Sequence, residues 1–354
     1  MNSIDVKNLE VIEEAVATRI QAYREDPQSS LSSLQNDKSE IKGNDFQVMC
    51  IHDLASYKFK PREPILSPWL NSQDLCMVYA ARGIGKTHFA LSIAYAVATG
   101  TNFLKWNAEK PRKVLYLDGE LPGIVLQQRL AMHCPEKEPE KGYFKVWTPD
   151  LLGLEEDAPL MPDLSTLEGQ KVINSQIEPD TAFVVVDNLS AWCRTGRENE
   201  GESWLPMSAW LSYLRRRGIA VLLVHHAGKN GGQRGTSKKE DLLDISIALE
   251  RPKDYLPEQG AAFTAEFTKA RHLKGSEAES LEIVLAGTEE KAEWSWRTVE
   301  LSTFDRVVAL TNEGLRPSEI VSELQINKST VSRHLRRAKE EGFIENYLSA
   351  GSKI

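Results

Sequence analysis

The stretch Ala80–Thr87, with the sequence AARGIGKT, decides how the rest of the chain is interpreted. An apolar run, Leu75–Tyr79, precedes it, and a segment with apolar residues at helical spacing, Phe89–Ala98, follows it. The stretch is therefore expected to form a loop between a strand and a helix. Gly83 and Gly85 would let the main chain of this loop approach a ligand closely, because glycine has no Cβ.

A loop in this setting binds a phosphate chain through main-chain N–H groups and the positive end of the helix dipole. Lys86 is expected to reach the β- and γ-phosphates, and the Thr87 hydroxyl to hold Mg²⁺. The pattern G-x-x-x-x-G-K-[ST] is complete except at its first position, Ala80, where alanine fits if its φ is negative. The alternative is a chance glycine turn before a helix. The expected ATP-binding residues are Ala81, Arg82, Gly83, Ile84, Gly85, Lys86, Thr87 and His88.

The composition narrows the class of protein. A length of 354 residues favours two domains. No apolar run approaches a membrane span, and the N-terminus lacks a basic and then apolar signal sequence, so we expect a cytoplasmic protein without a membrane partner. The four cysteines are scattered, which indicates neither a metal site nor a disulfide framework. A net charge of −8 leaves nucleic-acid binding to local basic patches.

The order of apolar and polar segments predicts four regions. Residues 1–25 form an amphipathic helix, which either folds back or docks on a neighbouring subunit, and residues 26–45 form a linker. Strand and helix patterns then alternate over 46–300, which predicts an α/β domain with a mostly parallel central sheet. The remaining residues, 301–354, form a small helical domain. The expected strands after the glycine loop include Lys113–Leu117, Phe183–Asp187, Ile219–Val224, Asp244–Leu249 and Ala262–Thr268, with a final hairpin of Leu281–Leu285 and Ala292–Thr298.

Acidic residues follow two of these strands. Asp187 closes a buried strand, where a carboxylate can hold Mg²⁺ through a water molecule; the alternative is a turn aspartate. Many such ATPases have the catalytic glutamate next, but here Asn188 follows. Glu120, at the end of another strand, is therefore our candidate for the base that orients water, with a surface turn acid as the alternative. Asp118, two residues earlier, is the candidate for a structural role.

Taken together, four motifs resemble the RecA-like ATPases grouped with the plasmid replicative helicase RepA. The resemblance covers about Phe46–Val299 and rests on the order and spacing of the motifs. It implies a RecA fold, a homo-oligomer that forms a hexameric ring, ATP hydrolysis between subunits, and movement on single-stranded DNA. The motifs are Ala80–Thr87, Leu117–Pro122, Val184–Asn188, and Leu223–His226 with Arg234–Ser237.

The resemblance also assigns roles at the site. It implies that His226 senses the γ-phosphate, whereas the alternative is a hydrogen-bonded histidine at a strand end. Lys269 and Arg271 look like the Lys-x-Arg pair that ring helicases send into the neighbouring subunit's site. Two cations two residues apart on a strand face the same way, and a guanidinium would neutralise charge on the transferred phosphoryl group. Arg234 is the competing residue, and a solvated basic strand end is the alternative.

Two polar loops are candidates for contact with DNA. They are Arg194–Ser203 and the longer, basic Ala227–Glu240, and the resemblance places such loops in a ring channel where cations follow phosphates. The alternative is a mobile surface loop. The candidate DNA-binding residues of the second loop are Lys229, Arg234, Lys238 and Lys239.

The C-terminal region resembles a helix-turn-helix. We expect helices over Phe304–Thr311 and Pro317–Leu324, then a third that starts at an N-cap, Ser329. Phe343–Ile354 could form a short wing, and the alternative to DNA binding is a protein-docking role, because Glu340 and Glu341 blunt the basic face. On the third helix, Val331, Leu335 and Ala338 face inward, while Thr330, Arg333 and Arg337 face outward with Arg336 nearer the flank.

The sequence thus predicts an ATPase that acts on single-stranded DNA as a helicase or translocase, in the replication of a plasmid or mobile element. It would also bind duplex DNA through the C-terminal domain. Two alternatives stay open: an ATP-gated DNA-binding regulator, and a loader that does not unwind DNA.

Overall fold

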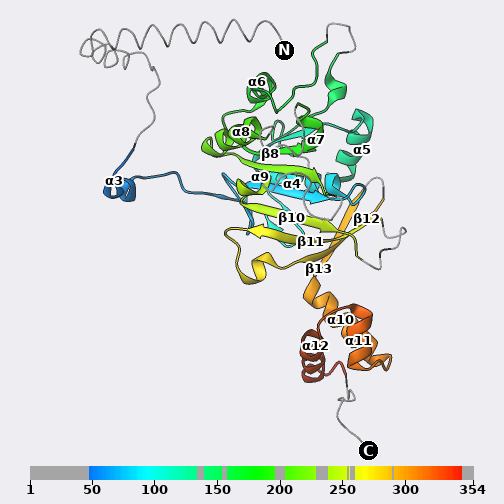
Figure 1. The fold of residues 1–354 in the computed structure, drawn as a ribbon. Helices are drawn as coiled ribbons and strands as arrows, with labels where there is room; N and C mark the ends of the chain where they lie inside the picture. The colour runs from blue at the N-terminus through cyan, green and yellow to red at the C-terminus, as the bar shows by residue number, and fades with distance from the viewer. Residues whose placement is uncertain are drawn as a thin grey trace, which may run out of the picture. The chain divides into compact units, whose positions relative to one another are not determined.

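The computed structural model describes residues 48–133, 139–153, 158–195, 204–228, 238–252, 255, 260–288 and 291–344 (Figure 1). The chain divides into two units, Met1–Lys60 and Pro61–Ile354. The described part of the first unit contains a short helix, α3 (Ile51–Ser56), with no buried side chain. The expected N-terminal helix and linker, residues 1–25 and 26–45, lie outside the described residues.

A nine-stranded sheet organises the described part of the second unit, in the order β13-β12-β11-β10-β3-β9-β8-β6-β7. The strands from β10 to β7 in this order are parallel, and β11, β12 and β13 extend the sheet with antiparallel pairs. The strand bounds are β3 (Leu75–Ala80), β6 (Lys113–Asp118), β7 (Phe144–Trp147), β8 (Thr181–Asp187), β9 (Ala220–His226), β10 (Ile245–Glu250), β11 (Ala261–Ala270), β12 (Leu281–Gly287) and β13 (Ala292–Thr298).

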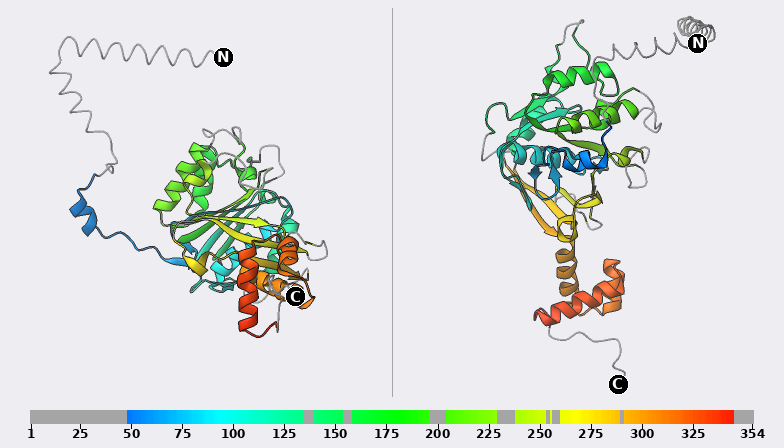
Figure 2. Two further views of the ribbon diagram at one scale, coloured as in Figure 1. Left: turned by 60° about the horizontal axis from the view of Figure 1, so that its bottom comes forward. Right: turned by 90° about the vertical axis from the view of Figure 1, so that its left-hand side faces the viewer.

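Helices cover both faces of this sheet (Figure 2). Because successive strand residues point to opposite faces, Val78 packs into one core with α4 (Lys86–Thr99), and Met77 into a second core with α8 (Leu205–Arg216). The first core also receives α5 (Gly123–His133), and the second receives α6 (Leu167–Gln176) and α7 (Leu189–Trp192). Two buried layers therefore hold the sheet between them.

The predicted α/β fold with a mostly parallel sheet is confirmed. The sequence pattern missed the shortest elements, because two or three residues show no periodicity. Two hairpins among them bring Trp69 and Trp106 together, with ring centroids 5.5 Å apart. The remaining elements of the described residues are β1 (Pro64–Leu66), β2 (Leu70–Asn71), β4 (Asn102–Phe103), β5 (Trp106–Asn107), the 3₁₀ turns Pro149–Leu151 and Gly275–Ala278, and α9 (Lys238–Asp241).

Three helices follow the sheet: α10 (Val299–Asn312), α11 (Pro317–Leu324) and α12 (Lys328–Glu340). They share a small core that includes Phe304, Ile320 and Leu335. The start of α10 lies before the expected domain boundary at 300/301, because Thr298 ends β13 and its side chain caps the helix by accepting the N–H of Leu301.

The expected N-cap of the third helix was wrong. α12 begins at Lys328 and its N-cap is Asn327, so Ser329 lies inside the first turn. Of the expected wing, Phe343 and Ile344 are described, and residues 345–354 lie outside the described residues. Among the described residues, no helix has both the length and the apolar character needed to cross a bilayer.

One close main-chain contact gives a test of the packing. A Cβ on Gly169, in α6, would lie 2.1 Å from the carbonyl oxygen of Asp163. The Asp163 carboxylate in turn binds the main-chain N–H groups of Ser165 and Arg194. We expect Gly169→Ala to lower the free energy of unfolding by about 1 to 3 kcal/mol, because the backbone must shift. Chemical denaturation measures this, with the exposed Lys171→Ala on the same helix as control; equal stability of the two variants would contradict the packing.

Candidate functional site

The loop between β3 and α4 has the shape expected of a phosphate-binding loop. Gly83 and Gly85 have φ of 73° and 119°, and a Cβ on Gly85 would lie 3.2 Å from the side chains of Ala261 and Phe263. The Lys86 ammonium donates to the carbonyl oxygens of Ala80 and Ala81, at 3.1 and 2.8 Å. Its burial lowers the pKa of Lys86. The loop therefore holds a partly desolvated cation beneath its glycines.

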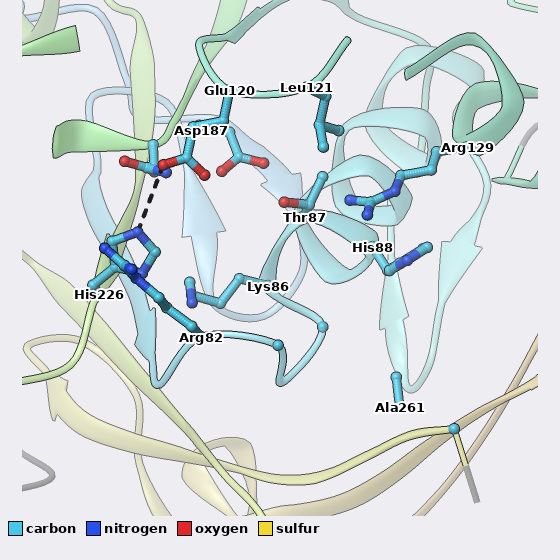
Figure 3. Close-up of a pocket in the computed structure, with 14 residues that line it drawn as sticks. Arg82, Lys86, Thr87, His88, Glu120, Leu121, Arg129, Asp187, His226 and Ala261 are labelled. Carbon is cyan, nitrogen blue, oxygen red and sulfur yellow. Dashed lines mark ion pairs between the residues drawn. The ribbon is translucent and has the colours of Figure 1, made fainter. Parts of the chain in front are cut away.

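A pocket of about 550 Å³ opens above this loop, a volume suited to a nucleotide (Figure 3). It brings together the loop, Glu120, Asp187 and His226, as the sequence predicted. Of the expected nucleotide-binding residues, Ala81 lies outside the lining and contributes its carbonyl to Lys86, and Ile84 is buried in the core. Lining residues that the sequence analysis missed are Leu121, Arg129, Asn188, Gly260 and Ala261.

Asp187 ends β8 at the floor of the pocket and is buried. Its Oδ2 accepts a hydrogen bond from the Tyr116 hydroxyl at 2.7 Å. Burial raises the pKa of Asp187, and hydrogen bonds from Tyr116 and Thr87 oppose this rise. Asp187 and Thr87 thus lie together, as a shared Mg²⁺ site would require.

Asp118 shapes the turn that carries Glu120. Its carboxylate accepts the main-chain N–H groups of Glu120 and Leu121, at 3.3 and 2.9 Å. Burial raises the pKa of Asp118 to about 7, with smaller contributions from Asp187 and Glu120. The Glu120 side chain is 54% exposed and faces the pocket. The geometry therefore separates a buried acid that forms the turn from an exposed acid that can meet water.

His226 ends β9 and faces Glu120 at the same end of the pocket (Figure 3). Its Nε2 lies 3.8 Å from Glu120 Oε1. Burial, and then the charge of Lys86, lower the pKa of His226, so the ring is neutral at pH 7 and this contact is not an ion pair. His226 Nδ1 has no hydrogen-bond partner among the described residues.

Lys269 and Arg271 are far along the sheet from this pocket. Because β11 runs antiparallel to β10, its first residue, Ala261, lines the pocket, whereas Ala270 pairs with Ile245 at the start of β10. Both cations reach the C-terminal end of α9, and Arg271 also reaches Asp244 beyond it. Lys269 Nζ donates to the Glu240 carbonyl, and Arg271 donates to the Asp241 carbonyl at 2.8 Å and pairs with Asp244 at 3.4 Å. The fold does not bring them to their own chain's phosphate loop.

The expected DNA-binding residues are only partly described. Lys229 and Arg234 lie outside the described residues, and only the main chain of Lys238 and Lys239, in α9, is described.

On α12, Arg333 pairs with Glu300 at 3.6 Å, and Arg337 pairs with Glu341 at 2.8 Å. The Arg337 guanidinium also lies 4.4 Å from the centre of the Phe304 ring. Arg337 is therefore at the flank beside α10, and Arg336 is exposed, the reverse of the predicted placement. Thr330 is half-buried.

A hydrogen-bonded chain behind the pocket was not predicted. His88 Nδ1 lies 2.8 Å from His133 Nε2, and His133 Nδ1 lies 2.9 Å from Ser92 Oγ. Trp294 Nε1 donates to the same hydroxyl at 2.9 Å. Burial lowers the pKa of His88 to about 4 and that of His133 to about 3. The i, i+4 spacing of His88 and Ser92 was visible in the sequence, but their partners come from α5 and β13.

This fold and site define a RecA-like P-loop ATPase. The chain belongs to the AAA domain family (AAA_25), whose profile matches residues 42–232, more than half of its length. Membership implies nucleotide-dependent activity and, as is usual in such ATPases, use of Mg²⁺. A second profile, described as bacterial regulatory protein, arsR family, matches residues 307–346 and identifies the C-terminal helices as a helix-turn-helix.

Solved structures with similarity include a KaiC-like protein, PH0186, from the hyperthermophilic archaeon Pyrococcus horikoshii OT3. It is 11% identical, with a TM-score of 0.46, over 65% of this chain and 93% of that one. The RadB recombinase is 19% identical, with a TM-score of 0.42, over 63% of this chain and 90% of that one. No curated protein matches the sequence.

The buried histidine pair predicts a pH-dependent stability. An unfolded histidine has a pKa near 6.5, so as the pH falls from 7 to 5 the unfolded chain takes up a proton that folded His133, with a pKa of about 3, does not. Stability present above pH 6.5 is thus lost as the pH falls. We expect His133 to account for about 2 kcal/mol of this loss. Urea denaturation at both pH values should show a smaller loss for His133→Gln, and equal losses would contradict a neutral, buried ring.

Proposed function

We propose that the chain is an oligomeric ATPase that moves on single-stranded DNA, a replicative-type helicase or translocase of the RepA kind. One observation supports this proposal: the pocket gathers groups that would bind a triphosphate and orient water, while Lys269 and Arg271 lie at the other end of β11. If Arg271 acts on ATP, it would do so in the pocket of a second copy, because it does not reach the pocket of its own chain. The site therefore favours hydrolysis between subunits.

The described residues fit ATP and Mg²⁺. The pocket has the size of a nucleotide site, the glycine loop leaves space for a phosphate chain, and Lys86 supplies a buried positive charge. Mg-ATP supplies the phosphoanhydride bond that is cleaved. Thr87 and, through water, Asp187 would hold the metal. Lys86 would leave its carbonyl partners for the β- and γ-phosphates.

Glu120 is the proposed base. Asp118 fixes the main chain on either side of it, and its own carboxylate reaches the pocket with enough exposure to meet water. Glu120 would orient a water molecule and accept its proton. His226, beside it, would report γ-phosphate occupancy from its position at the end of β9, since β9 continues into the basic loop 227–240.

The proposed DNA contacts lie in two regions. In a hexameric ring, Lys229, Arg234, Lys238 and Lys239 would line the channel and follow phosphates of single-stranded DNA. Duplex DNA would be bound by the C-terminal region through residues that include Thr330, Arg333 and Arg337. The proposed domains are 46–300 for the ATPase and 301–354 for the helix-turn-helix. We place this activity in the replication of a plasmid or mobile element.

A second candidate is an ATP-gated DNA-binding regulator or loader without unwinding activity. The match of residues 307–346 to the arsR family favours it, because that family is one of bacterial regulatory proteins. The two candidates share ATP binding and differ in strand displacement, which only the translocase performs.

Glu120→Gln tests the proposed chemistry. The amide cannot accept a proton, so we expect steady-state ATP turnover to fall about 100-fold or more while ATP binding persists. Strand displacement from a tailed duplex should be lost in parallel. The exposed Glu168→Gln is the matched control and should behave like the wild type. Full turnover by Glu120→Gln would refute the base, and turnover without strand displacement in the wild type would favour the second candidate.

Subunit mixing tests whether Arg271 acts in the ATP pocket of a neighbouring subunit. Arg271→Ala and Lys86→Ala subunits should each be nearly inactive, yet a mixed ring contains interfaces with an intact pocket and an intact arginine. About a quarter of the interfaces in a random equal mixture are of this kind, and ATP turnover should recover in proportion. Lys86→Ala mixed with Glu120→Gln is the control, since no pocket then has both residues. Recovery in neither mixture would count against Arg271 acting on a neighbour.

A further inference from the structure

The pocket has two chemically different ends (Figure 3). Glu120, Asp187 and His226 gather around Lys86 at one end, which the proposed function assigns to the γ-phosphate. At the other end lie His88 and Arg129, and the Arg129 guanidinium points across the pocket toward Thr87. A nucleotide oriented by these groups would place its α-phosphate at the His88 end.

His88 is held from behind by a chain of three other side chains. The chain starts at Trp294 of β13, passes through Ser92 of α4 and His133 of α5, and ends at His88 Nδ1, with every link between 2.8 and 2.9 Å. The His133 and Trp294 rings are also stacked, with an interplanar angle of 26°. Ser92 and His133 are 5% exposed. Water therefore competes little for these hydrogen bonds.

All the hydrogen bonds of the chain can point in one direction, from Trp294 to His88. An indole N–H can only donate, so Ser92 Oγ accepts from Trp294. The one proton of the Ser92 hydroxyl can then go to His133 Nδ1, and in that arrangement a neutral His133 ring has its proton on Nε2. His133 Nε2–H then donates to His88 Nδ1, and His88 carries its own proton on Nε2.

We propose that Trp294, Ser92 and His133 fix His88 in the Nε2–H form, and that this N–H donates to the α-phosphate of the bound nucleotide. His88 is then a ligand-binding residue, and the other three are positioning residues. The inference rests on the proposed function, because it takes the orientation of the nucleotide from the proposed γ-phosphate end. It adds a side-chain contact to those of a phosphate loop, which binds mainly through its backbone.

Two substitutions at His88 distinguish loss of the Nε2–H donor from loss of side-chain packing. The amide nitrogen of glutamine can take the place of Nε2, and that of asparagine lies near Nδ1. We therefore expect His88→Gln to bind ADP within about threefold of the wild type, and His88→Asn to bind about tenfold more weakly, as for loss of a hydrogen bond to a charged group. Isothermal titration calorimetry with ADP and with a non-hydrolysable ATP analogue measures both. The loss should be equal for the two nucleotides, because the α-phosphate is common to them.

The tautomer of His88 is measured in the wild-type protein. Nitrogen-15 spectra of histidine-labelled wild-type protein, assigned by the His88→Gln spectrum, should show a protonated Nε2 and an unprotonated Nδ1. Ser92→Ala removes the donor to His133, so it should mix the two forms and weaken ADP binding about threefold. Thermal melts verify that each variant is folded.

Several results would overturn the inference. They are a proton on Nδ1 of His88, ADP binding by His88→Asn equal to that of the wild type, and a loss confined to the ATP analogue, which would place His88 at the γ-phosphate. Failure of the wild type to bind either nucleotide, or unchanged binding by Lys86→Ala, would instead refute the nucleotide site of the proposed function. The two failures are thus distinguishable.

Discussion

The site depends on the burial of charge at one edge of the parallel sheet. Asp118 and Asp187 are paired residues at the ends of β6 and β8, and Ala80 and His226 are paired at the ends of β3 and β9. Four strand ends therefore converge on one place, where two buried carboxylates have raised pKa values and Lys86 has a lowered one. Burial destabilises the ionised form of each of these side chains. A ligand that brings both a divalent cation and anionic phosphates would place an opposite charge beside the carboxylates and beside Lys86.

This convergence explains why much of the site could be predicted from sequence. Parallel strands end at a common edge, so residues directly after apolar runs, such as Glu120, Asp187 and His226, are neighbours in space although far apart in the chain. The same reasoning found the sheet and its order of strands and helices. It worked because the buried strands are long enough for their apolar character to be unambiguous.

The features that were missed have no local signature. Arg129 and His133 occupy helical positions that a sequence pattern treats as surface or core, and their place in the site depends on how α5 packs against α4. Arg337 was expected to face outward because its helix position is polar, but the ring of Phe304 on α10 attracts the guanidinium to the flank. Tertiary contacts between elements decide such cases, and a helix pattern contains no information about them.

The antiparallel extension gives the fold two connections that a purely parallel sheet lacks. β11 starts beside the phosphate loop and carries Lys269 to the far edge, so a single strand spans the distance between one pocket and the edge proposed to face another. β13 carries Trp294 to the polar chain behind His88 and then runs directly into α10. Glu282 of β12 holds this junction, because its carboxylate binds both Arg297 of β13 and Ser302 of α10. A displacement of β13 would therefore be carried into the first turn of α10, so the helix-turn-helix is joined by hydrogen bonds, and not only by the chain, to the part of the sheet that supports the nucleotide pocket.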